Sequence, residues 1–466
     1  MKAVPLLLAL TFVIPVLPSV SGSASSPIPQ ASGWTIELVH AFGGSSPPAI
    51  RLDGAGHPHV LACPPGQVWY AVRENSAWRE ELVANTVAGG VCGKLALDAG
   101  GDPRITIPPR AGDPGQMYGV RLGGGWSFLP VPFPVADLEI GSASEPAIVG
   151  VGASLRFAVL EGGWQVETVE AFGGSAGLAW ADLEFDGSGA PRVLYYDSVR
   201  GDVRYAFRDA AGWHVEVVEH IGALNAIGRQ GSLALDSLGS PHTAYVIRTQ
   251  PMRLDTFYAL RGPSGWTKQW VANGYAPSLG IRGDGVPVVG YKTGFPGLGI
   301  DIATRTTSAW SVEPVPDPTS GPAAAQFPMM ILDRCDKAHL VWYDFDLPAV
   351  LYATKGGPCG PSQKVSFHLE PETLNLKSNG RWVTAYLATE NASFADIDAK
   401  YLRLNGVAVA WSAVLWNHGL MAKFDRAAFA ATLAPGDAVT VTLTGRWRDD
   451  GTFTATDTIR VIKPGR

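Results

Sequence analysis

A tryptophan preceded by glycine or alanine recurs along most of the chain, and each copy opens a segment of alternating pattern such as WTIELV or WQVETV. Successive copies lie 38 to 53 residues apart, which includes the spacing of propeller blades. An LALD-like segment, a turn and a segment with an aromatic–alanine pair follow the copies, with Tyr118-Gly119 and Ile302-Ala303 as variants of the pair. The tryptophans are Trp34, Trp78, Trp126, Trp164, Trp213, Trp266 and Trp310. Such four-stranded units cannot bury their faces alone, so the sequence predicts an all-β fold with a seven-bladed β-propeller over residues 34–360.

The two ends of the repeat predict how the propeller closes. If the LALD-like strand is innermost, the last unit (residues 329–353) lacks an outer strand, while the first tryptophan strand (residues 34–39) has no blade of its own. We therefore expect a one-plus-three closure, in which the N-terminal strand completes the last blade.

The composition and the N-terminal residues indicate where the protein is located and which classes of partner it lacks. The formal net charge is −6 and 17% of residues are charged, which excludes a strongly basic surface for nucleic acid or an anionic membrane. Met1-Lys2, an apolar stretch over residues 4–20 and the small residues Gly22-Ser23-Ala24 predict a signal peptide over residues 1–24. We expect an exported monomer, extracellular or periplasmic and not inserted in a membrane, in a compartment where disulfides persist.

The four cysteines test the predicted topology. In an up-and-down blade, Cys63 and Cys92 lie on one face of adjacent blades, while Cys335 and Cys359 lie on the opposite face of the last blade. Four cysteines allow three pairings, and only Cys63 with Cys92 and Cys335 with Cys359 keeps each pair on one face. These are the predicted disulfides.

The repeat stops near Gly360, and residues 364–466 predict a separate antiparallel β-sandwich of immunoglobulin-like size. This segment resembles a module found at the C-terminus of many secreted bacterial repeat proteins, which implies an extracellular setting without assigning a chemistry. The resemblance rests on Pro371 to Leu376, Arg403 to Gly406, Lys423 to Arg426 and Asp457 to Val461. Relatives often carry an Asp/Gly-rich calcium segment before the Lys-Phe pair, but here that place reads Trp416-Asn417-His418-Gly419-Leu420, so we predict no calcium there. We also predict no other metal and no cofactor.

Three sets of recurring polar residues are predicted to be structural. Histidines at one blade position would not converge on a metal, aspartates that end inner strands would cap turns, and glutamates three residues after the tryptophan would protect the exposed outer edge. The sets are His59, His242 and His339; Asp53, Asp98, Asp186, Asp236 and Asp333; and Glu37, Glu81, Glu167, Glu216 and Glu313.

Residues that break the repeat are the candidate site. Unequal loops gather on the face of Cys63 and Cys92, and they bring arginine forks and aromatic rings that suit a glycan or a protein surface. The predicted ligand-binding residues are Trp180, Tyr196, Asp197, Arg200, Arg229, Arg248, Arg253, Tyr343 and Asp344.

Three functions remain open from the sequence. The first is a non-enzymatic binding protein that presents this loop face to a glycan or an extracellular protein, because the common catalytic motifs are absent from the sequence. The second is a hydrolase or lyase acting on glycans, with Asp197 or Asp344 as acid or base. The third is a structural surface protein, whose loop face would have no concave pocket.

Overall fold

The structure is a computed structural model that describes most of the chain outside its N-terminal segment. The described residues are 28–29, 33–41, 46–74, 76–87, 92–122, 124–141, 144–174, 180–222, 231–251, 253–294, 299–318, 325–356, 364–390, 397–415, 419–446 and 452–463. The predicted signal peptide therefore lies outside the described residues.

Residues 49–220 form four antiparallel sheets, each of four sequence-consecutive strands. The first contains β3 (Ala49–Leu52), β4 (Pro58–Ala62), β5 (Gln67–Glu74) and β6 (Ala77–Asn85). The second contains β7 (Leu95–Leu97), β8 (Pro103–Ile107), β9 (Met117–Leu122) and β10 (Gly125–Pro130). The third contains β11 (Asp137–Ile140), β12 (Pro146–Val151), β13 (Ser154–Leu160) and β14 (Trp164–Ala171). The fourth contains β15 (Ala181–Phe185), β16 (Pro191–Asp197), β17 (Asp202–Asp209) and β18 (Gly212–His220).

Two further sets of strands share the long strand β22, whose first part ends one set and whose second part begins the next. The first set contains β19 (Gly231–Leu235), β20 (Pro241–Gln250), β21 (Arg253–Gly262) and β22 (Gly265–Ile281). The second continues from β22 with β23 (Pro287–Thr293), β24 (Ile300–Arg305) and β25 (Trp310–Val315).

The last sheet joins the N-terminal and C-terminal ends of the repeat region. It contains β26 (Ala325–Leu332), β27 (Ala338–Asp344), β28 (Ala349–Lys355), β2 (Trp34–Ala41) and β1 (Ile28–Pro29). Strand β2 pairs antiparallel with β28, so Trp34 lies opposite Lys355. Strand β2, the first tryptophan strand, thus lies outside β28 in this sheet, as the sequence predicts.

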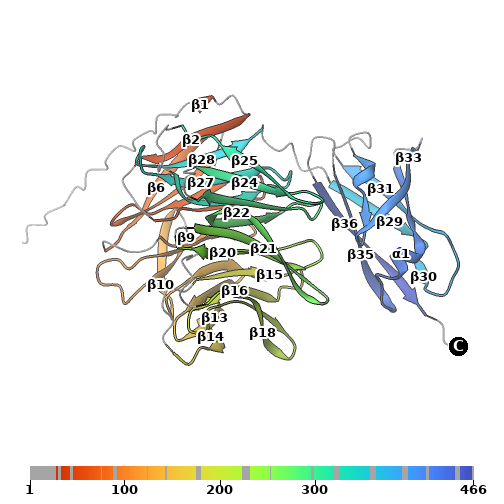
Figure 1. Cartoon of the computed structure of the whole chain (residues 1–466), viewed down its shortest axis with the longest axis horizontal. Coiled ribbons are helices and arrows are strands. Elements are labelled where there is room, and N and C mark those ends of the chain that lie inside the picture. The colour runs from red at the N-terminus through yellow and green to blue at the C-terminus, as the bar shows by residue number, and fades with distance from the viewer. Residues whose placement is uncertain are drawn as a thin grey trace, which may run out of the picture.

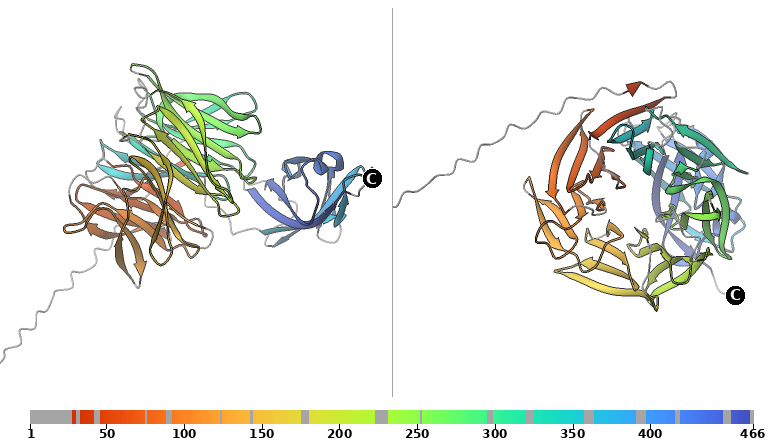
Figure 2. Two further views of the ribbon diagram at one scale, coloured as in Figure 1. Left: turned by 90° about the horizontal axis from the view of Figure 1, so that it is seen from below. Right: turned by 60° about the vertical axis from the view of Figure 1, so that its left-hand side comes forward.

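The innermost strands of the sheets lie side by side in a cycle, and this makes the region a β-propeller. Contacts run from β3 through β7, β11, β15, β19, β22 and β26, and then back to β3. Figure 1 shows the stacked sheets, and the right-hand view of Figure 2 shows them arranged around a central axis.

The recurring tryptophans explain why successive sheets pack. Six of the indoles meet, edge to face, an aromatic ring on the third strand of the preceding blade, with ring centroids 5.3–5.8 Å apart. The pairs are Tyr70–Trp126, Trp78–Tyr352, Tyr118–Trp164, Phe157–Trp213, Tyr205–Trp266 and Tyr258–Trp310. The blade that carries Ile302 in place of the aromatic packs it in one core cluster with Trp34. The sequence repeat is therefore a repeat of inter-blade contacts.

The outer-strand glutamates do not act as edge protection, and this prediction is corrected. Four of them accept a hydrogen bond of 2.9–3.1 Å from the indole Nε1 of the next blade, and all five pair with a cation of that blade. The glutamates and their partners are Glu37 with Trp78 and Arg73, Glu81 with Trp126 and Arg121, Glu167 with Trp213 and Arg208, Glu216 with Arg261, and Glu313 with Trp34 and Lys355. We call these contacts the inter-blade clasps. A carboxylate bound to two donors in the neighbouring blade connects blades rather than repelling other molecules.

The recurring aspartates and histidines form turn networks, as the sequence predicts. Asp53, for example, accepts backbone hydrogen bonds from Ala55 and His57 at 2.9 and 2.8 Å. The buried His242 contacts the Tyr258 hydroxyl at 2.6 Å through Nδ1 and Asp236 at 3.5 Å through Nε2. His59 and His339 have the same two kinds of partner. Each imidazole thus links an inner-strand turn to the third strand of its own blade.

One disulfide joins Cys63, which follows β4, to Cys92, which precedes β7, with an S–S distance of 2.08 Å. It connects the first two blades, which are also bridged by a shared apolar cluster. The partner predicted for Cys335, Cys359, lies outside the described residues, so that pairing stays a prediction.

Residues 364–463 form one mostly antiparallel sheet in the order β29-β31-β34-β33-β32-β35-β36-β30. Its elements are β29 (Lys364–Glu370), β30 (Thr373–Asn375), β31 (Trp382–Glu390), the 3₁₀ turn η2 (Ala399–Tyr401), β32 (Arg403–Leu404), β33 (Val407–Leu415), β34 (Gly419–Asp425), α1 (Arg426–Ala430), β35 (Gly436–Arg446) and β36 (Thr452–Ile462). Both halves contribute to a single core that includes Leu369, Phe424, Leu443 and Val461. This C-terminal unit therefore has a hydrophobic core of its own.

Candidate functional site

The predicted loop face is built from the turns that follow the second strand of each blade. Three of these turns carry predicted site residues, and each is held by a buried aspartate. Asp197 ends β16, Asp344 ends β27 and Asp255 lies in β21, with exposed fractions of 0%, 0% and 2%. We call the turns 197–202, 247–255 and 344–349 the loop face.

The turn after β16 is fixed by a network of charges. The Asp197 carboxylate accepts the backbone N–H groups of Val199 and Arg200 at 2.9 and 3.1 Å and also pairs with the Arg200 side chain. Glu170 from the neighbouring blade binds Arg204 at 2.6 Å and contacts Arg200 at 3.5 Å. The Arg200 side chain is 43% exposed, so its guanidinium reaches the surface while Asp197 and Glu170 hold it in position.

The turn between β20 and β21 is fixed in a similar way. Asp255 accepts hydrogen bonds from Arg253 Nε at 2.8 Å, from Trp270 Nε1 at 3.0 Å and from the Thr249 hydroxyl. Burial alone would raise the pKa of Asp255, but these donors outweigh it and lower the pKa. The carboxylate therefore stays ionised, and Arg253 is held with 45% of its side chain exposed.

The turn after β27 combines a buried acid with a buried amine nearby. Asp344 accepts the backbone N–H of Leu347 at 2.8 Å. Lys292, on β23, is only 1% exposed, and burial lowers its pKa against the opposing charges of Asp317 and Asp344. The acid that the sequence offers as a catalytic candidate thus takes part in the internal structure of its blade.

The predicted aromatic residues are not surface platforms in this structure. Trp180, Tyr196 and Tyr343 are 8%, 1% and 3% exposed. The Trp180 ring lies so close to Gly231 that a Cβ there would meet it at 2.1 Å. The apolar side chains that are exposed on these turns are instead Val199 (43%), Phe345 (48%) and Leu347 (42%). The turn sequence alone could have suggested them, because each stands between a capping aspartate and the next strand.

The remaining predicted arginines are placed as follows. Arg248 lies in β20 opposite Leu254, and its Nε is buried without a hydrogen-bond partner among the described residues. Arg229 lies outside the described residues. Arg200, Arg248 and Arg253 are therefore the guanidinium groups that the structure places on or beside the loop face.

A second group of polar residues, on the innermost strands, was missed by sequence reasoning. We call it the inner-strand cluster, and it comprises Arg51, Lys94, Asp137, Glu139, Asp182 and Glu184. Arg51 on β3 pairs with Glu139 on β11 although β7 lies between these strands, so the contact is on the axis side of the propeller. Lys94 lies 3.8 Å from Asp137. No cation is paired with Asp182 or Glu184 among the described ion pairs.

Two members of the cluster also connect blades. Asp137 accepts the backbone N–H of Leu183 at 2.9 Å, and Asp182 accepts that of Leu233 at 2.6 Å. At the corresponding place of the next blade, the Ser232 hydroxyl accepts the N–H of Leu279 at 3.0 Å. Serine makes the same contact there, and the corresponding position holds Ala49, Lys94 and Met329 in other blades, so the scaffold does not require the charge of the two carboxylates.

The environment of these carboxyl groups raises their pKa values. Burial, followed by the charges of neighbouring acids, raises the pKa of Asp182 and of Glu184 well above the ordinary range. Glu139 is raised mainly by burial, and the Arg51 charge opposes that shift. The cluster therefore holds carboxyl groups whose burial and mutual repulsion raise their pKa values, which favours their protonated forms. Its sequence signal is the motif Asp-Leu-Glu, which occurs in two successive inner strands, together with the cations Arg51 and Lys94 in the corresponding segments of the first two blades.

No group of three or more metal-ligating side chains suited to a metal ion is present among the described residues. Within the same residues, no helix is long and apolar enough to cross a membrane.

Comparisons with known proteins give similarity at low sequence identity. No family model matches the chain, and no curated protein matches it. Among solved structures, the chain is similar to YCF48 bound to a D1 peptide (9% identity, 72% of this chain and 99% of that one, TM-score 0.47). It is also similar to the six-bladed fucose-recognising lectin of Aleuria aurantia (14%, 61% and 100%, TM-score 0.40). A third similar structure is the WD40 β-propeller domain of Doa1 (10%, 69% and 97%, TM-score 0.41).

Proposed function

We propose that this protein is an exported, non-enzymatic binding protein in which a seven-bladed propeller presents its loop face to a glycan or a protein. The C-terminal unit is a β-sandwich module on the same chain. The supporting observation is the design of the three turns of the loop face. Their aspartates are buried and bind backbone N–H groups or an arginine of the same turn. Their apolar and guanidinium groups point outward. Such preorganised loops lose little entropy when they bind a partner.

The exposed groups indicate what the loop face would contact. Val199, Phe345 and Leu347 supply apolar surface, and Arg200 and Arg253 supply planar donors beside it. Apolar groups next to arginine are enriched where proteins recognise partners. In this proposal Arg248 and Arg229 extend the same face, and the buried Trp180, Tyr196 and Tyr343 support it from below.

The test is a glycan-array and protein-capture assay with the mature protein, followed by affinity measurement for each hit. We expect Phe345→Ser and Arg253→Ala each to weaken binding about tenfold or more. Leu238→Ser is the matched control, because Leu238 is 63% exposed in a turn on the opposite face of the propeller. Equal affinity for all three variants and the parent would overturn the assignment of the loop face. Silence in both assays would favour the structural surface protein.

A glycan-acting hydrolase or lyase is the second candidate, and the inner-strand cluster is the observation that favours it. Asp197 and Asp344 are fully buried and hold their own turns. Asp182 and Glu184 instead lie near other carboxyls on the axis side, and their raised pKa values favour the protonated form that a general acid requires. Each array hit should be incubated and checked for cleavage. Turnover that disappears in Glu184→Gln but persists in Phe345→Ser would establish the enzyme.

A further inference from the structure

The C-terminal unit has one sheet face that its core does not cover. Alternate side chains of β29, β31 and β34, such as Leu369, Val383 and Phe424, are fully buried in the core. The intervening side chains therefore point to the other face. Strand register places Glu370 opposite Thr384, Thr384 opposite Lys423, and Lys423 opposite Trp411. These four residues form one row across four adjacent strands.

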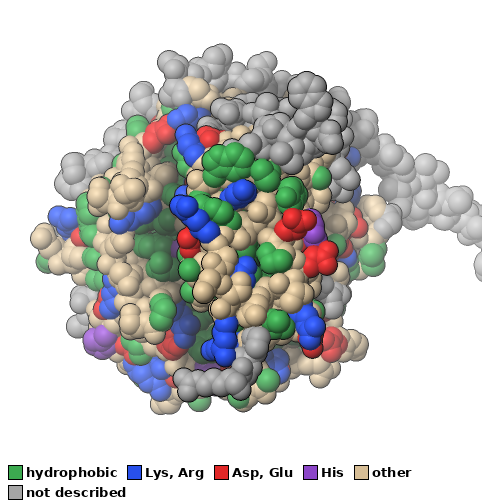
Figure 3. Space-filling model, turned by 90° about the vertical axis from the view of Figure 1, so that its right-hand side faces the viewer, with side chains coloured by type: hydrophobic (Ala, Val, Ile, Leu, Met, Phe, Trp, Pro, Cys, Tyr) green, Lys and Arg blue, Asp and Glu red, His purple; other side chains and the backbone are tan. Residues whose placement is uncertain are grey.

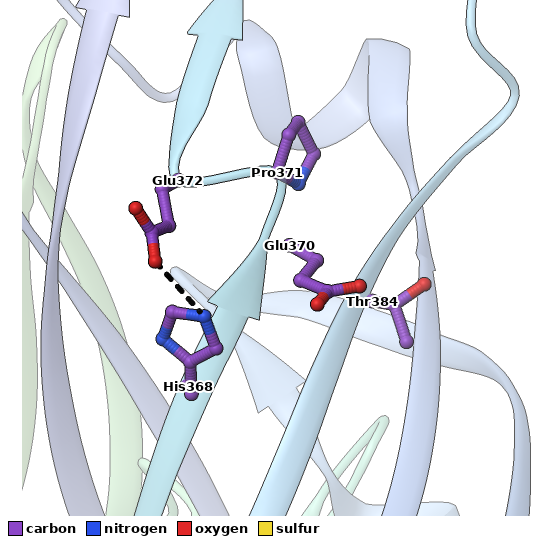
Figure 4. A pocket seen from close by; sticks show the side chains of 5 residues that line it. All are labelled: His368, Glu370, Pro371, Glu372 and Thr384. Atoms are coloured by element: carbon purple, nitrogen blue, oxygen red, sulfur yellow. Dashed lines mark ion pairs between the residues drawn. The ribbon is translucent and has the colours of Figure 1, made fainter.

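One end of this row is hollowed. His368, Glu370, Pro371, Glu372 and Thr384 line a depression of about 580 Å³, shown in Figure 4. The depression is wide open to solvent, so it is a shallow surface site and not an enclosed cavity. Apart from the proline, the lining consists of an imidazole, two carboxylates and a hydroxyl, so it offers both hydrogen-bond donors and acceptors.

The His368 imidazole lies between two carboxylates and still has hydrogen-bonding capacity on its ring nitrogens. His368 Nδ1 lies 3.5 Å from Asp457, whose carboxylate is fixed by the backbone N–H groups of Leu369 and Thr458 at 2.7 and 2.8 Å. His368 Nε2 lies 3.6 Å from Glu372 (Figure 4). Both distances exceed an ordinary N–H···O hydrogen bond. The ring can therefore still bond to a ligand hydroxyl between these carboxylates.

The other end of the row is aromatic. The Trp411 side chain is 49% exposed, and the Lys423 ammonium lies 5.4 Å from its ring centroid. Three strand spacings, about 14 Å, separate Glu370 from Trp411. An extended ligand could therefore touch the indole and the depression together.

The chemistry of the face indicates the kind of ligand. Acidic and basic side chains are mixed along the row, and Figure 3 shows both signs on the side of the molecule that carries the C-terminal unit. A strongly charged ligand would meet like charge somewhere along such a row. A neutral polyhydroxyl chain, by contrast, can use every donor and acceptor and stack its apolar face on the indole.

We propose that the outer face of β29, β31, β34 and β33 binds a neutral oligosaccharide, with Trp411 as the stacking subsite and the depression at His368 and Thr384 as the hydrogen-bonding subsite. This site is separate from the loop face and does not depend on the function proposed for it. It makes the chain a protein with two binding surfaces.

The experiment is an array of short neutral oligosaccharides probed with the mature full-length protein, followed by calorimetry on the strongest hit. Trp411→Ala should weaken binding about tenfold or more, and Thr384→Val should weaken it less. Leu82→Ala is the control, because Leu82 is 42% exposed on β6, an outer propeller strand, and takes no part in the loop face. Thermal unfolding of each variant checks that the fold is intact.

The outcomes separate this site from the loop face. Loss of binding in Trp411→Ala with retention in Phe345→Ser and Leu82→Ala supports the proposal. Binding that disappears only in Phe345→Ser places the saccharide on the loop face and overturns it. The absence of any neutral oligosaccharide hit, or an equal effect of Trp411→Ala and Leu82→Ala, also overturns it.

Discussion

The indole of Trp34 donates a 3.1 Å hydrogen bond to the carboxylate of Glu313, although 279 positions separate the two residues in the chain. Lys355, which lies opposite Trp34 in the closing sheet, binds the same carboxylate. One glutamate thus joins the N-terminal strand, the last strand of the repeat and the preceding blade. The closure of the propeller uses the same clasp that connects other blades.

The closing clasp predicts a measurable contribution to stability. Trp34→Phe keeps most of the buried ring but removes the indole donor, so we expect the free energy of unfolding to fall by about 1 kcal/mol. Trp310→Phe is the control, because the Trp310 Nε1 is buried without a hydrogen-bond partner among the described residues. Urea unfolding should show a smaller change for this variant. If both variants lose the same stability, the hydrogen bond to Glu313 contributes nothing specific.

The Cys63–Cys92 disulfide should stabilise the junction of the first two blades. It closes a loop with a sequence separation of 29. Replacing both cysteines by alanine should lower the free energy of unfolding by about 2–4 kcal/mol. The double variant avoids reductant, which would act on any second disulfide as well. Unchanged denaturant midpoints for the variant and the parent would contradict the prediction.

The inner-strand cluster predicts a stability that decreases as pH rises. The pKa of Glu184 is raised in the folded protein, so the folded state binds more protons than the unfolded state above the ordinary glutamate value. The stability that this group contributes is present at low pH and is lost as pH rises through its folded pKa. Glu184→Gln should therefore flatten the pH dependence and be more stable than the parent at alkaline pH.

Chemical unfolding at a series of pH values measures this effect. Glu161→Gln, at an exposed turn, is the control and should follow the parent curve. A Glu184→Gln curve parallel to that of the parent would show that Glu184 does not titrate with unfolding.

The turn-capping aspartates predict the opposite behaviour in acid. Burial raises the pKa of Asp186, but Ser188, the Ala190 N–H and Arg192 outweigh it and lower the pKa to about 2. The stability from this group is present above the unfolded value of about 4 and is lost as pH falls toward 2. Asp186→Asn should destabilise the protein at neutral pH and lose less stability on acidification. A steeper acid dependence in the variant would contradict this account.

Local sequence rules predicted the turns well. An aspartate before a glycine-containing turn bonds to N–H groups two and four residues away, so Asp53 and Asp186 could be assigned from short-range pattern alone. The same rules do not predict the role of the outer glutamates, because the partners of these glutamates are remote in the chain. Glu37 meets Trp78 and Arg73 only because a neighbouring blade lies beside its own, and strand pattern carries no information about that partner.

The candidate site shows the same limit. The sequence directed attention to Asp197 and Asp344 because they interrupt the repeat, and the structure buries both as supports of their turns. It gave no reason to group Arg51 with Glu139, because their contact depends on the curvature that brings the first and third blades around the axis.

The sequence by itself determined the repeating unit, its turns and the strand that completes the last blade, because these depend on short-range alternation and on a count of strands. Only the tertiary structure decided which charged groups meet, which aromatic rings are covered and which side chains remain for a ligand. Those outcomes depend on distances between segments that are remote in the chain, and the packing of one blade on the next sets those distances.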